Sequence, residues 1–107
     1  MSYRVTVRRG SKVKHQRTET LDEAIAALEH HASRAPRLGH EEFVNRRFEP
    51  HQLISVRVEL KGSGVRAGVD VRGDGSMVAW TGRLRRAEIE TLSGESASAA
   101  LRRTLRA

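Results

Sequence analysis

Apolar and polar residues alternate most regularly between residues 52 and 84, where two glycine-rich turns separate three strand patterns. The alternating apolar positions of the first two patterns are Val56, Val58, Leu60, Val65, Ala67, Val69 and Val71. Period-two alternation is typical of a sheet with one buried face and one wet face. The positions between them are mostly charged, so the sequence predicts a wet face that carries arginine and lysine.

Residues 3–8 alternate in the same way and are followed by Gly10 and Ser11. Glycine supplies the positive φ that a tight hairpin turn needs, so a return strand is predicted over residues 12–18. Val13 is the only apolar residue of this second strand. We therefore expect it at a sheet edge, where its lysines discourage pairing with another edge.

Two amphipathic helices are predicted. Thr20 and Glu23 have the spacing of a capping box at the start of the first helix, which should end near Ser33. Ser93 is the predicted cap of the second helix. The apolar stripes of the two helices are Leu21, Ala24, Ile25, Leu28 and Ala32 in the first, and Ala97, Ala100, Leu101 and Leu105 in the second.

The third strand pattern begins at Met77 and runs to about Leu84, after an Asp-Gly turn at residues 73–76. We expect Val78, Trp80 and Leu84 on its core side. Residues 34–50 have no clear period and form a long connection of unassigned structure.

Together these patterns predict one α+β domain over residues 1–107, with elements in the order ββαβββα. Its mostly antiparallel sheet has about five strands, and both helices pack on one face. The predicted core is Val5, Val7, Leu21, Ile25, Leu28, Val56, Val58, Val69, Val71, Trp80 and Leu101. Burial of Arg57 or Arg66 would contradict this strand phase, because a buried unpaired charge is very unfavourable.

The formal net charge is +7 and arginine is the favoured cation, which suggests an anionic partner. The chain has no cysteine, which excludes disulfides and thiolate zinc sites. No apolar run begins the chain or approaches the ~18 residues of a membrane span. The expected location is the cytoplasm, without a membrane partner.

Catalytic signatures do not emerge from the sequence. It contains no G-x-S-x-G motif, and its glycine turns do not follow the phosphate-loop pattern. A metal or catalytic cluster would be sought first among His40, Glu41, Glu42 and His51, which flank the long connection. We expect no enzymatic activity, no metal, no cofactor and no small-molecule substrate.

The basic sheet face is the predicted functional surface, and its ligand is predicted to be an anionic polymer, RNA or a ribonucleoprotein. The predicted binding residues are Arg4, Arg8, Arg57, Lys61, Arg66 and Arg72, with Lys12 and Lys14 joining from the edge. Glu59 and Asp70 fall on the same face, where cross-strand ion pairs are expected. Tyr3 and Trp80 are expected on the core side, which leaves phosphate contacts rather than base stacking.

Two alternatives remain open at this point. The protein can be a homodimeric or partner-binding scaffold without a nucleic-acid role, since an open sheet face or a free strand can support assembly. The charged face can also be an ordinary solvated surface, because net charge governs solubility as well as association.

Overall fold

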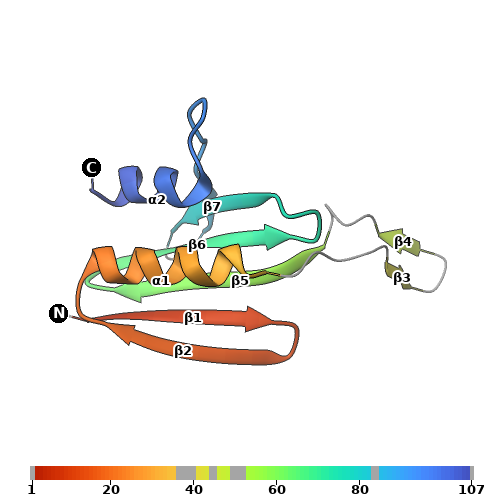
Figure 1. The fold of residues 1–107 in the computed structure, drawn as a ribbon, viewed down its shortest axis with the longest axis horizontal. Coiled ribbons are helices and arrows are strands. Elements are labelled where there is room, and N and C mark those ends of the chain that lie inside the picture. The colour runs from red at the N-terminus through yellow and green to blue at the C-terminus, as the bar shows by residue number, and fades with distance from the viewer. Residues whose placement is uncertain (1, 36–40, 44–45, 49–52, 83–84, 107) are drawn as a thin grey trace.

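One antiparallel sheet carries two helices on a single face (Figure 1). The computed structural model describes residues 2–35, 41–43, 46–48, 53–82 and 85–106. In chain order the elements are β1 (Tyr3–Arg9), β2 (Lys12–Thr18), α1 (Leu21–Ser33), β3 (Glu41–Phe43), β4 (Arg46–Phe48), β5 (Ile54–Gly62), β6 (Val65–Arg72), β7 (Met77–Thr81), β8 (Ala87–Glu88) and α2 (Ala97–Arg106).

The main sheet has six strands in the order β2-β1-β5-β6-β7-β8, with antiparallel pairing throughout. The predicted α+β class is confirmed. The third strand pattern is shorter than expected, because β7 ends at Thr81 and the two-residue β8 pairs back against it. Leu84 lies outside the described residues. Within the long connection, β3 and β4 form a separate two-stranded pair.

The strand register assigns each residue to one of two faces, because residues opposite each other in a ladder share a face. Helix α1 packs on β1, β5 and β6, and α2 packs on β6 and β7. The hydrophobic core lies between these helices and the sheet. Its buried members include the predicted residues Val5, Val7, Ile25, Leu28, Val56, Val58, Val69, Val71 and Leu101. Leu21 packs against it while partly buried.

The phase of β5 and β6 is confirmed, whereas the phase of β7 is the reverse of the prediction. Arg57 stands opposite Asp70, outside the core, and Lys61 stands opposite Arg66. In β7, however, Ala79 is opposite the core residue Val69, so Trp80 lies on the other face of the sheet. The sequence run from Met77 to Trp80 is apolar throughout and indicates no phase by itself.

Helix α1 begins as predicted at its capping box. The Thr20 hydroxyl accepts a hydrogen bond from the Glu23 amide at 3.1 Å and donates to the Glu23 carboxylate at 3.2 Å. The cap satisfies one of the amides that a helix start leaves without an intrahelical partner.

Removal of this cap in Thr20→Ala is expected to lower the free energy of unfolding by about 1 kcal/mol. Urea denaturation followed by circular dichroism measures the loss. Glu19→Ala, one residue earlier and outside the capping box, is the matched control. An equal loss in both variants would contradict a specific capping contribution.

The cap of helix α2 lies three residues later than predicted, at Ser96 rather than at Ser93. The hydroxyl of Ser96 accepts from the Ala99 amide at 3.1 Å and thus caps the helix. Glu95 accepts from the Leu92 amide and from Arg103, and the Arg103 guanidinium holds the pKa of the Glu95 carboxyl below its ordinary value. Through these contacts, the loop that precedes α2 packs against the helix.

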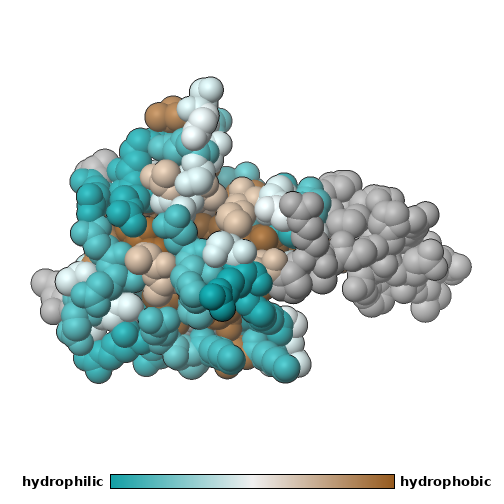
Figure 2. Space-filling model, viewed as in Figure 1, coloured by the Kyte–Doolittle hydropathy of each residue, from teal (hydrophilic) through white to brown (hydrophobic). Residues whose placement is uncertain are grey.

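The helix-bearing side of the molecule is seen in Figure 2, where hydrophilic residues cover most of the surface and apolar ones are visible between the elements. An ion pair between Asp22 and Arg106 joins the first turn of α1 to the last turn of α2. Neither of these two helices, the only ones in the described part of the chain, is long and apolar enough to cross a membrane.

Candidate nucleic-acid interface

The sheet face opposite the helices, here called the open face, carries charged side chains in transverse rows. In one row four cations oppose one another across four successive strands. This cationic row consists of Arg17 on β2, Arg4 on β1, Lys61 on β5 and Arg66 on β6. It forms because the two-residue turn at Gly10 and Ser11 places Arg4 opposite Arg17.

All six residues predicted for the interface belong to the open face by register, but they do not form one cluster. Arg4, Lys61 and Arg66 lie in the cationic row. Arg8 opposes Arg57 in another row, which the opposed residues Thr6 and Glu59 separate from the cationic row. Arg72 opposes Ile54 near the start of β5. The expectation for Lys12 and Lys14 is wrong, because they oppose Arg9 and Val7 and therefore belong to the helix side.

Arg57 is already neutralised within the fold. Its guanidinium donates to both carboxylate oxygens of Asp70, from Nε at 2.8 Å and from Nη2 at 3.1 Å. Only 30% of the Arg57 side chain and 17% of the Asp70 side chain are exposed. A bidentate pair of this kind leaves little of the charge for a ligand. The ion pair with Asp70 that was expected across the strands is therefore present, and it gives Arg57 a structural role.

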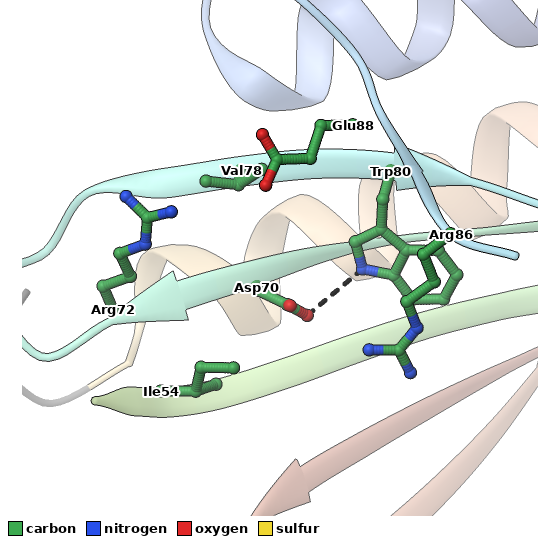
Figure 3. A pocket seen from close by; sticks show the side chains of 7 residues that line it. All are labelled: Ile54, Asp70, Arg72, Val78, Trp80, Arg86 and Glu88. Atoms are coloured by element: carbon green, nitrogen blue, oxygen red, sulfur yellow. Dashed lines mark hydrogen bonds between the residues drawn. The ribbon is translucent and has the colours of Figure 1, made fainter. Parts of the chain in front are cut away.

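Trp80 is the aromatic centre of the open face. Its indole N–H donates to Asp70 Oδ1 at 3.1 Å, and its ring lies against the backbone of β6 at Gly68 (Figure 3). A Cβ atom at Gly68 would come within 2.5 Å of both the Trp80 ring and the Val58 carbonyl oxygen. Glycine at this position thus makes the room that the indole occupies.

Arg86 covers the outer side of this indole. The Arg86 Cζ atom lies 4.3 Å from the ring centroid, and Nη2 donates to Glu59 at 3.2 Å. Gly82 directly follows β7; its φ is +134°, and a Cβ atom there would lie 1.7 Å from the Arg85 carbonyl oxygen. Between the Gly68 backbone and this cation–π contact, Trp80 is only 2% exposed, although it is outside the main core.

A hollow of about 540 Å³ lies beside the Trp80–Arg86 pair (Figure 3). Apolar and charged side chains line it together: Ile54, Asp70, Arg72, Val78, Trp80, Arg86 and Glu88. The volume falls within the roughly 300–1,000 Å³ of small-ligand pockets. The hollow combines apolar side chains with two guanidinium groups, and the Trp80 indole contributes little exposed surface to it.

Besides the misplaced Trp80, sequence reasoning missed three residues of this surface. Arg17 had a usable signal, because a two-residue hairpin turn already determines that it opposes Arg4. Gly68 in the middle of a strand pattern was a signal for close approach by another group, here Trp80. Arg86 had no such signal, because only the pairing of β8 with β7 brings this part of the chain back to Trp80.

No group of three or more potential metal ligands occurs in the described parts of the chain. Of the residues proposed for a metal or catalytic cluster, His40 and His51 lie outside the described residues, and the side chains of Glu41 and Glu42 are not described. No family model, curated protein or solved structure matches the chain. The function must therefore be inferred from the chemistry of the site.

Proposed function

We propose that this protein is a non-catalytic cytoplasmic module that binds the phosphate backbone of RNA, free or within a ribonucleoprotein, through the cationic row. One observation carries the proposal: four cations from four adjacent strands stand side by side, and no carboxylate shares their row. Adjacent strands are about 4.8 Å apart, so the row extends over about 14 Å.

Three of the four cations of this row carry charge that is available to a ligand. Arg4, Arg17 and Lys61 make no ion pair with any described residue. Arg57 and Arg86, by contrast, are engaged by Asp70 and Glu59. Cations without internal partners lose no contact when they bind phosphate, and they release condensed counterions from the nucleic acid.

Phosphate contacts made by such a row determine affinity and position rather than sequence. Arg8 and Arg72 lie on the same face and extend the positive surface beyond the row. We expect binding with little sequence preference and with strong salt dependence, because each neutralised phosphate contributes to the slope of affinity against salt.

The charge-reversal pair Arg4→Glu with Lys61→Glu is expected to weaken RNA binding on the order of 10- to 100-fold at low salt. Both substitutions replace an attraction to phosphate by a repulsion. Fluorescence anisotropy of a labelled single-stranded RNA, titrated at about 50 and about 200 mM salt, measures the affinity and its salt slope. The variant should also show a shallower slope than the wild-type protein.

Lys12→Glu with Lys14→Glu is the matched control, because it changes the net charge equally but lies on the helix side. We expect it to retain most of the affinity. Equal losses in both variants would contradict a localised site, and no binding by the wild-type protein at low salt would refute the proposal. Circular dichroism verifies that both variants fold.

Light scattering distinguishes the alternative of a homodimeric or partner-binding scaffold. A dimer that persists at high salt and binds neither RNA nor DNA would support assembly in place of RNA binding. β2 is one edge of the sheet and its side chains are almost entirely exposed and polar, which disfavours pairing of two copies through this edge.

A further inference from the structure

Arg86 lies over the Trp80 indole on the open face, and neighbouring groups hold both side chains in place. The indole is held from below by the Gly68 backbone and at its edge by Asp70. Above it, the Arg86 guanidinium is held against the ring and tethered by Glu59. Trp80 is only 2% exposed, so the part of this stack that a ligand can reach is the Arg86 side chain, which is 36% exposed.

Such a surface suits one kind of ligand group in particular. Unpaired nucleobases stack on aromatic rings and on the planes of arginine guanidinium groups. A fixed guanidinium stacks at a lower entropic cost than a free one, because its rotamers are already restricted. The adjoining hollow adds apolar contact from Ile54 and Val78 and a second guanidinium from Arg72.

The stack is also close to the cationic row. Arg66 lies two residues before Gly68 on β6, and Gly68 opposes Trp80 on β7. The rise of about 3.4 Å per residue and the strand separation of about 4.8 Å place the Arg66 and Trp80 backbones roughly 8 Å apart. One nucleotide can therefore have its phosphate at the row and its base at the stack.

We propose that the Trp80–Arg86 stack and the hollow beside it bind an unpaired base of single-stranded RNA whose phosphates lie on the cationic row. This inference rests on the proposed function and deepens it by naming the substrate class. A duplex keeps its bases stacked on one another, so it reaches the cationic row but not the Trp80–Arg86 stack.

Trp80 is the single tryptophan of the chain, so its fluorescence reports directly on this site. The test titrates the protein with a single-stranded oligoribonucleotide, an abasic strand of equal length and a duplex of the same sequence. We expect the base-bearing strand to change the Trp80 emission and to bind on the order of 10-fold more tightly than the abasic strand. The abasic strand and the duplex should leave the emission unchanged.

Arg86→Lys keeps the charge but removes the planar guanidinium, and Arg85→Lys is the matched control on the neighbouring exposed residue. In Arg86→Lys, the affinity for the base-bearing strand should fall close to the affinity for the abasic strand. In Arg85→Lys, the ratio of these two affinities should stay at the wild-type value. Urea denaturation confirms that both variants fold.

The outcomes separate this inference from the proposal on which it rests. Equal affinity for intact and abasic strands, with unchanged emission, would overturn the base site and leave phosphate binding intact. A duplex that binds as tightly as the single strand and alters the emission would also overturn it. No binding of any strand would overturn both proposals.

Discussion

Asp70→Ala is expected to lower the free energy of unfolding by about 3 kcal/mol, because it leaves a partly buried guanidinium and a buried indole N–H unsatisfied at once. Arg57 loses both oxygens of a bidentate ion pair, and the Trp80 indole N–H loses its acceptor. Urea denaturation followed by circular dichroism measures the loss. The emission of Trp80 should shift as well, since its ring edge becomes free to reorient.

Two further variants make this prediction specific. Asp70→Asn keeps an acceptor oxygen but loses the charge, and it should cost less than Asp70→Ala. In a double-mutant cycle with Arg57→Ala, the two losses should be clearly less than additive, because both remove the same ion pair. Glu90→Ala, at an exposed carboxylate, should change stability by less than about 0.5 kcal/mol. A comparably small effect of Asp70→Ala would contradict the network.

Gly68→Ala is expected to destabilise the protein by about 2–3 kcal/mol, although it adds only one methyl group. The new Cβ atom would meet the Trp80 ring and the Val58 carbonyl oxygen at 2.5 Å, and neither is the end of a flexible side chain. The indole must move off β6 or the β5–β6 pair must open. Thermal unfolding and the Trp80 emission measure the two consequences.

Gly94→Ala provides the comparison for this prediction. Gly94 has a φ of +78° and no atom within 4 Å of an added Cβ, so its replacement carries only backbone strain of about 1 kcal/mol. Trp80→Leu in combination with Gly68→Ala should cost less than the sum of the two single changes, because the smaller side chain relieves part of the overlap. Gly68→Ala with wild-type stability would show that the indole does not lie against this glycine.

Several features of the fold follow from local sequence alone. The faces of β5 and β6 were predictable because charged and apolar residues alternate strictly there, and reversal would bury Arg57 and Arg66 without partners. Helix α1 was predictable because Thr20 and Glu23 satisfy each other within four residues. The two-residue turn after β1 likewise contains enough information to place Arg17 opposite Arg4.

Only the tertiary structure decides the orientation of Trp80 and the charges that remain available on the open face. The apolar run of β7 fits either face. The small Ala79 side chain lies on the helix side, where α2 packs on β7, and Gly68 on the neighbouring strand accommodates the indole on the other side. Likewise, Arg57 looks like a surface cation in sequence until β6 brings Asp70 against it. Contacts between segments distant in the sequence depend on the strand register and on the space that neighbouring side chains leave. A local sequence pattern encodes neither of these.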